Sequence, residues 1–178
     1  MLVSMVGMMN EAREKGYGIP GLRAFDELRM RACIAAAEEK KSPLLIIAGF
    51  KMLPDICFFG EMCRQLAFRT EVPVAVVLDH GSSYDQAVWA IRAGFTDIMV
   101  DRSTLPYEEN AAQAKELVKI AHSVGVGVEA ELGHVGQGAH YEQDGVTGLT
   151  IPEEAVAYVQ ETGVDTLAVA VGTAHGVY

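Results

Sequence analysis

The sequence lacks paired cysteines, an excess of positive charge and long apolar runs, which are typical of secreted, nucleic-acid-binding and membrane proteins respectively. Its three cysteines, Cys33, Cys57 and Cys63, are an odd number without CxxC spacing, which excludes a disulfide framework and a thiolate zinc site. We expect all three to be small structural residues of the core. Positive charge is also scarce: 14 Lys and Arg stand against 24 Asp and Glu, so the net charge is −10. This field excludes nucleic acid and anionic membrane surfaces as general partners.

Long apolar runs are missing as well. No stretch approaches the roughly 20 residues that a membrane span requires, and the N-terminus lacks the basic-then-apolar layout of a signal peptide. We therefore expect a cytoplasmic protein with no membrane partner. Low-complexity segments and a convincing domain boundary are absent too. The 178 residues, half of them apolar, are enough for a single domain over residues 1–178.

Short apolar runs alternate with helix-like segments along the whole chain. The predicted strands lie near residues 17–21, 43–48, 72–78, 96–100, 126–132 and 165–171. These runs are continuously apolar, which is typical of parallel strands covered by helices. A βα-barrel and a doubly wound sheet both fit this order. No GxGxxG follows the first strand, which disfavours the dinucleotide-binding form of the sheet.

Several helix boundaries are explicit in the sequence. Residues 150–153 (Thr-Ile-Pro-Glu) form a capping box that predicts a helix ended by Gly163. Residues 82–85 begin another helix, and Gly94 ends it. Pro106 begins a third helix, whose apolar face is Ala111, Ala114, Leu117, Val118 and Ala121.

Ionisable side chains follow four consecutive predicted strands, the third to the sixth. Asp79 and His80 follow the third, Asp101 the fourth, Glu131 the fifth and His175 the sixth. The carboxyl ends of parallel strands are where α/β proteins keep their chemistry. Charged groups there are costly unless they are paired or bind a metal ion. The two histidines predict a zinc-type site, for which a third protein ligand remains to be found, and Asp79 beside them suits general acid/base work or helix capping.

The glycine-rich segment 133–148 lies between a strand and a helix. A loop of this length predicts an active-site lid, with an ordinary surface insertion as the alternative. His134 and His140 within it are candidate ligands or plain loop residues. His122 and Trp89, each within a helix, are expected to be structural.

Five motifs and the opening of the chain together resemble one family. They are VPVAVVLDHG (72–81), AIRAGFTDIMVDRS (90–103), LPYEEN (105–110), AHSVGVGVEAELG (121–133), LTIPEEAVAYVQETGVDTLAVAVGTAHGVY (149–178) and the opening residues 1–21. In this order they resemble the class II, zinc-dependent ketose-bisphosphate aldolases of fructose- or tagatose-bisphosphate type. The resemblance runs over essentially the whole chain.

The resemblance implies a fold and a set of roles. The fold is a (β/α)8 TIM barrel, of which about six βα units are present. Asp79 matches the proton donor and acceptor at the aldehyde oxygen, and His80 and His175 match ligands of the catalytic Zn²⁺. Asp101 and Glu131 match carboxylates of a second or alternative cation position.

The same resemblance implies contacts with the substrate and with other copies. Gly176 matches a backbone contact to dihydroxyacetone phosphate, and Ser103 is assigned to the substrate site. Family members are commonly homodimers or higher oligomers.

Three features depart from the family. The chain ends at Tyr178, whereas family members continue through two more βα units that carry the third zinc histidine and the phosphate-binding loops. The segment 22–26 lacks the usual asparagines. The loop pattern after Glu131 is longer and shifted, which leaves Glu142 as the candidate equivalent of a loop acid/base.

We predict reversible, zinc-dependent cleavage of fructose or tagatose 1,6-bisphosphate to dihydroxyacetone phosphate and glyceraldehyde 3-phosphate. The alternative is a noncatalytic metal- or sugar-phosphate-binding barrel subunit that lacks the terminal strands. A phosphosugar epimerase would explain the ligands but not the ordered motifs.

Overall fold

The computed structural model describes residues 1–53, 55–137 and 148–176 of the chain. Helices and strands alternate along it. In chain order they are α1 (Met5–Lys15), β1 (Gly21–Arg23), α2 (Glu27–Lys40), β2 (Leu44–Ala48), the 3₁₀ helix η1 (Phe50–Met52), α3 (Ile56–Ala67), β3 (Val74–Gly81), α4 (Tyr84–Ala93), β4 (Asp97–Val100), α5 (Tyr107–Ser123), β5 (Gly127–Leu132), α7 (Pro152–Thr162) and β6 (Thr166–Val169).

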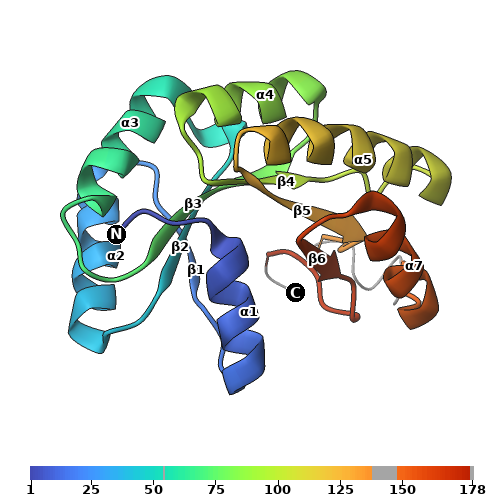
Figure 1. Ribbon diagram of the computed structural model, residues 1–178, viewed down its shortest axis with the longest axis horizontal. Coiled ribbons are helices and arrows are strands. Elements are labelled where there is room, and N and C mark those ends of the chain that lie inside the picture. The colour runs from blue at the N-terminus through green and yellow to red at the C-terminus, as the bar shows by residue number, and fades with distance from the viewer. Residues whose placement is uncertain (54, 138–147, 177–178) are drawn as a thin grey trace.

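The six strands form one parallel sheet in the order β1-β2-β3-β4-β5-β6. The sheet is arched, and α2, α3, α4, α5 and α7 follow one another along its outer side (Figure 1). A doubly wound sheet would reverse its strand order at a switch point, whereas a barrel adds each strand beside the last. The structure is therefore a half-barrel, and the predicted parallel α/β fold of TIM-barrel type is confirmed.

Each strand turns alternate residues to opposite sides, as the pleat requires. On β3, residues 74, 76 and 78 belong to the large core beneath the outer helices, while residues 75 and 77 belong to a small cluster with α1. Figure 1 shows α1 on the concave side of the arch, between the first and last strands. The small cluster consists of Met5, Met8, Ala75 and Val77.

Helix α1 is anchored to the sheet through its first turn. Ser4 is the N-cap, and its hydroxyl accepts from Val6 N. The same hydroxyl donates to Asp97 Oδ1 at 2.7 Å, and Met5 N donates to Asp97 Oδ2 at 2.9 Å. Asp97 is fully buried at the start of β4, and burial raises the pKa of its carboxyl.

Most of the predicted helix boundaries are confirmed. Gly94 and Gly163 end α4 and α7 in the left-handed conformation, at φ of 86° and 74°. Ser83 caps α4 by accepting from Gln86 N. Pro106 precedes α5, and the apolar face predicted for that helix is buried throughout.

Two predictions about local structure are wrong. The first strand lies at Gly21–Arg23 instead of residues 17–21, because it is the chain from residue 21 onward that pairs with β2. Thr150 does not form a capping box, and Ile151 stands at the N-cap without a side-chain bond. The Thr150 hydroxyl instead bonds the Leu132 carbonyl oxygen and accepts from Ala170 N at 2.8 Å. Competition from the two strand ends removes Thr150 from the helix.

The expectation of three core cysteines holds only in part. Cys63 is buried, and burial raises the pKa of its thiol to about 12. Cys33 is half-buried and Cys57 is exposed. Trp89 is also exposed, with the Arg92 guanidinium 4.8 Å from its ring centre, so it packs on the surface and not in the core. Among the described residues, no helix is both long and apolar enough to cross a membrane.

Candidate functional site at the carboxyl edge of the sheet

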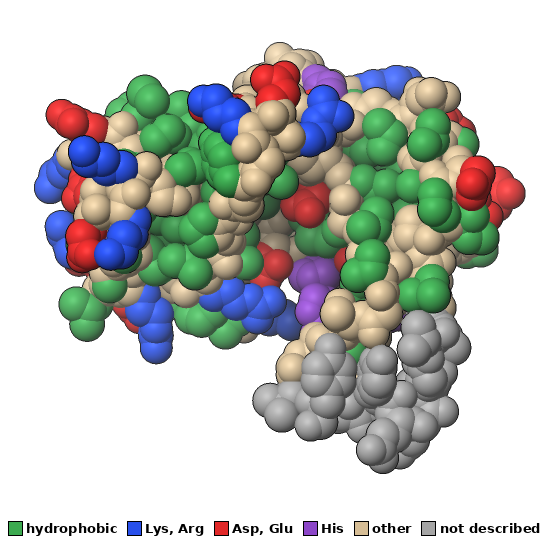
Figure 2. Space-filling model, turned by 90° about the horizontal axis from the view of Figure 1, so that it is seen from below, with side chains coloured by type: hydrophobic (Ala, Val, Ile, Leu, Met, Phe, Trp, Pro, Cys, Tyr) green, Lys and Arg blue, Asp and Glu red, His purple; other side chains and the backbone are tan. Residues whose placement is uncertain are grey.

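The ionisable side chains predicted from the strand ends meet in one hollow. Figure 2 views the molecule from below and shows purple histidines next to red carboxylates and blue cationic side chains in this hollow. His80 lies at its centre, with Asp79, Asp101 and Glu131 each within 4.0 Å of an imidazole nitrogen. The parallel strand order produces this gathering, since all strands end at the same edge.

The backbone holds His80 in an unusual conformation. Its φ is +51°, in the left-handed region that residues with a Cβ seldom occupy. The pairing of β3 with β4 shifts register between Leu78 and Gly81, as a β-bulge does. At Gly81, a Cβ would lie 2.8 Å from the Met99 carbonyl oxygen. The glycine after His80 thus lets the bulge form, and the bulge turns the imidazole toward the neighbouring strand ends.

His80, Asp101 and Glu131 form a cluster of metal-ligating type, with one candidate donor atom from each within 4.8 Å of the others. His80 Nδ1 lies 2.8 Å from Asp101 Oδ2 and 3.8 Å from Glu131 Oε2. The Asp101 bond raises the pKa of His80 and holds the pKa of Asp101 well below its usual range. The excess of carboxylate over imidazole in a partly buried site fits a divalent cation, for which imidazole and carboxylate are suitable ligands.

The two carboxylates of this cluster are held by further hydrogen bonds. Ser103 donates to Asp101 Oδ1 from its hydroxyl at 2.7 Å and from its backbone at 3.1 Å. The Ser103 hydroxyl also lies 3.0 Å from His134 Nδ1. Glu131 Oε1 accepts from Val135 N at 3.1 Å. The start of the segment after β5 therefore bonds Glu131 directly and reaches Asp101 through Ser103.

One oxygen of the Asp79 carboxylate faces His80, and the other faces Arg23, outside this cluster. Its Oδ1 lies 3.9 Å from His80 Nε2, while its Oδ2 accepts from Arg23 Nη2 at 2.8 Å. Arg23 comes from the end of β1, two strands away in the sheet. The carboxylate is thus oriented between an imidazole and a guanidinium.

His175 reaches the site from the segment after β6. Its ring lies edge-on against the His80 ring, with 5.3 Å between centroids. Its backbone N–H donates to the Gly136 carbonyl oxygen at 2.9 Å. The donor cluster of His80, Asp101 and Glu131 does not include His175. The structure brings the two histidines into ring contact, and the role of His175 as a ligand stays a prediction.

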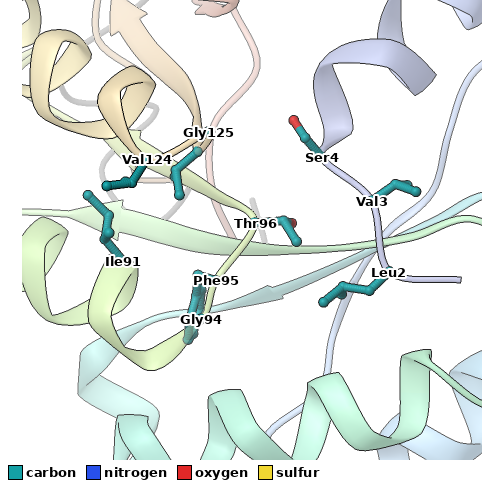
Figure 3. Close-up of a pocket in the computed structure, with 10 residues that line it drawn as sticks. Leu2, Val3, Ser4, Ile91, Gly94, Phe95, Thr96, Val124 and Gly125 are labelled. Carbon is teal, nitrogen blue, oxygen red and sulfur yellow. The ribbon is translucent and has the colours of Figure 1, made fainter.

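A second hollow lies at the opposite end of the sheet (Figure 3). Its volume is about 350 Å³, and no titratable side chain is among the residues that line it. The lining residues are Leu2, Val3, Ser4, Ile91, Gly94, Phe95, Thr96, Val124, Gly125 and Val126. The residues that line this hollow therefore offer no acid/base or metal-ligating side chain.

Comparison with known proteins agrees with this geometry. The model of the family "Fructose-bisphosphate aldolase class-II" matches residues 3–178. This chain belongs to the class II fructose-bisphosphate aldolase family. Members of this family depend on a metal ion, and the donor cluster at His80 suits one. The match also sets aside the epimerase alternative.

The aldolase relatives are longer than this chain. The fructose-bisphosphate aldolase of Thermus caldophilus is 42% identical over 181 residues, which are 100% of this chain and 59% of that protein. The probable fructose-bisphosphate aldolase of Bacillus subtilis is 40% identical and is covered to 64%. The crystal structure of the YdjI aldolase from Escherichia coli K12 superposes with a TM-score of 0.87 at 35% identity, over 98% of this chain and 64% of that one. The chain thus spans about 60% of the aldolases that it matches.

The family pattern also singles out Gly176 and Glu142. Gly176 has a φ of +88°, and a Cβ at this position would meet no atom of the described residues within 4 Å. Glu142, like His140, lies outside the described residues.

Three residues that shape the site are not predicted from the sequence. Arg23 lies in the segment 22–26, which departs from the family pattern, so the resemblance assigns it no role. Buried Arg102 donates at 2.7 Å to the carbonyl oxygens of Gly81 and Asp101, which ties two strand ends together. Asn110 Nδ2 donates to the Glu131 carbonyl oxygen at 3.0 Å. Arg23 ends β1 and Arg102 is the second residue after β4, so their places at strand ends are the signal that the sequence offers.

Proposed function

We propose that this chain carries the catalytic edge of an aldolase that cleaves a ketose bisphosphate, fructose 1,6-bisphosphate or tagatose 1,6-bisphosphate, reversibly. The products would be dihydroxyacetone phosphate and glyceraldehyde 3-phosphate. The observation that carries the proposal is the meeting of Asp79, His80, Asp101 and Glu131 in one hollow of a half-barrel from this family.

The metal ion in this proposal is Zn²⁺. His80 and His175 would hold it, with Asp101 and Glu131 as ligands of a second or alternative cation position. When bound, the ion supplies a Lewis acid that polarises the ketone oxygen and stabilises the charge left on the ketone half after cleavage. The ring contact of the two histidines and the carboxylates beside them support this assignment.

Asp79 would move the proton of the reaction. Its carboxylate takes the proton from the C4 hydroxyl during cleavage and returns it to the aldehyde oxygen during condensation. Its Oδ1 faces the imidazole side of the hollow, while its Oδ2 is held by Arg23. A carboxylate oriented in this way can exchange a proton without a change of rotamer.

Ser103 and Gly176 would complete the substrate site. Ser103 holds Asp101 through two hydrogen bonds, so its hydroxyl is fixed at the rim of the hollow. We further propose that residues 1–178 act as one domain, that the protein works in the cytoplasm and that it assembles as a homodimer or higher oligomer. Cell fractionation and light scattering test the last two statements.

The first experiment measures triose-phosphate release from both bisphosphates, with chelator and after zinc is restored. We expect chelator-sensitive cleavage that zinc restores. Asp79→Ala should bind zinc as the wild type does and lose cleavage, whereas His80→Ala should lose both. Folded, zinc-loaded wild type that cleaves neither sugar would contradict the proposal. It would favour the noncatalytic binding subunit, which is consistent with a chain that spans about 60% of the length of its relatives.

A further inference from the structure

Arg23 places a half-exposed cation at the mouth of the site. Its side chain is 52% exposed, whereas that of its partner Asp79 is 16% exposed. The ion pair bridges the ends of β1 and β3 across β2, at 2.8 Å. The guanidinium is therefore more exposed to solvent than the partly buried carboxylate that it pairs with.

The two oxygens of Asp79 divide the site into two sides. Oδ1 faces His80 Nε2, and Oδ2 faces Arg23. With Asp79 at the C4 oxygen, the ketone half of the substrate lies on the His80 side, where charge on its oxygen can be stabilised. The aldehyde half, which carries C4 to C6, then lies on the Arg23 side.

Arg23 offers hydrogen-bond donors to a ligand beyond the one that it uses for Asp79. A guanidinium offers five N–H groups in a planar fork, which suits the oxygens of phosphate. The hydrogen bonds found among the described residues use only Nη2, for Asp79. Lys51 of η1 adds an exposed cation shortly after β2, the strand that lies between those carrying Arg23 and Asp79. Figure 2 shows blue side chains directly beside the purple and red ones in the hollow.

From this geometry we infer that Arg23 is a specificity-determining residue, which binds the phosphate of the aldehyde half while Asp79 holds it in place. The inference rests on the proposed function, because the position of the aldehyde half follows from the role of Asp79. It adds to that function the residue that recognises the phosphate of the aldehyde half, so that a neutral aldehyde of the same length is disfavoured.

The test is a binding experiment in which no bond can form. D-glyceraldehyde 3-phosphate and uncharged D-glyceraldehyde are titrated by calorimetry into the zinc-loaded protein in the absence of a ketone. Arg23→Met removes the donors, Arg23→Lys keeps the charge without the fork, and Arg23→Gln is a second neutral variant in case the first does not fold. Arg29→Met is the matched control, because Arg29 pairs with Asp26 on the exposed side of α2.

Wild type and Arg29→Met should prefer the phosphorylated aldehyde. Arg23→Met and Arg23→Gln should lose about tenfold or more of that affinity, and Arg23→Lys should lose less. If Arg23→Met or Arg23→Gln binds the phosphorylated aldehyde as tightly as the wild type does, the inference is overturned. It is also overturned if the wild type binds both aldehydes equally well.

Failure of this inference can be told apart from failure of the proposed function. Arg23-dependent binding without any cleavage by the wild type refutes only the aldolase activity. Cleavage by the wild type together with binding that ignores Arg23 refutes only the role of Arg23.

Discussion

Replacing Gly60 with alanine should destabilise this protein, although alanine is the better helix former. Gly60 lies inside α3, where that helix crosses α4. A Cβ built on Gly60 would lie 2.1 Å from the Ala93 carbonyl oxygen and 3.2 Å from the Ala93 Cβ. The nearest atom belongs to the backbone, so no side-chain rotation can relieve the overlap. The two helices would have to separate.

The size of the effect follows from two opposing contributions. Alanine gains about 1 kcal/mol over glycine in a helix interior. Overpacking costs about 1–3 kcal/mol, and we take the upper end because the overlap is with backbone. The net loss is about 2 kcal/mol of unfolding free energy. For a chain of 178 residues this lowers Tm by about 4–8 °C.

Gly7→Ala in α1 is the matched control. A Cβ there would meet no atom within 4 Å, so only the helix-propensity gain of about 0.5–1 kcal/mol remains. Urea and thermal unfolding by circular dichroism should therefore move the two variants in opposite directions. If Gly60→Ala melts at or above the wild-type temperature, the close approach of α3 and α4 is not as described, and the reasoning fails.

Three further predictions concern the site and its support. Zinc at 100 times its Kd should stabilise the wild type by about 2.7 kcal/mol, which raises Tm by about 5–11 °C. His175→Ala should lose most of this shift, and a full shift would show that His175 is not a zinc ligand. Arg102→Met should cost about 2–3 kcal/mol in urea unfolding and weaken zinc binding about tenfold, since it frees Asp101, while exposed Arg92→Met should change neither. The pKa of Asp97 is raised above 3.8 in the folded state, so stability falls as pH rises from that value through the raised one. Asp97→Asn should flatten that slope in urea unfolding measured from pH 3.5 to 7, and an unchanged slope would assign it to other groups.

The strand ends could be predicted because their signals are local. A continuous apolar run followed by Asp79 and His80, or by Glu131, marks the end of a buried parallel strand. Glycines at helix ends, such as Gly94, are equally local, since the left-handed conformation favours them. The half-barrel and the centre of the site follow from these features together.

What the sequence could not predict depends on contacts between distant segments. The Thr150 hydroxyl matches a capping box, but the ends of β5 and β6 compete for it. Arg23 and Asp79 are 56 positions apart, and their ion pair exists only because β1 and β3 flank the same strand. Helix α1 lacks a strong apolar stripe, and Asp97, more than 90 positions away, anchors its first turn. The spacing of residues along the chain does not indicate such pairs.

The alternation of side chains along each strand places packing on one face of the sheet and chemistry on the other. On β5, Val128, Ala130 and Leu132 pack beneath the helices, while Glu129 and Glu131 turn to the opposite side. A substitution on the chemical side removes no contact from the large core. The carboxyl edge is therefore a place where a library of variants can be searched for new substrates while the packing of the sheet against its helices stays intact.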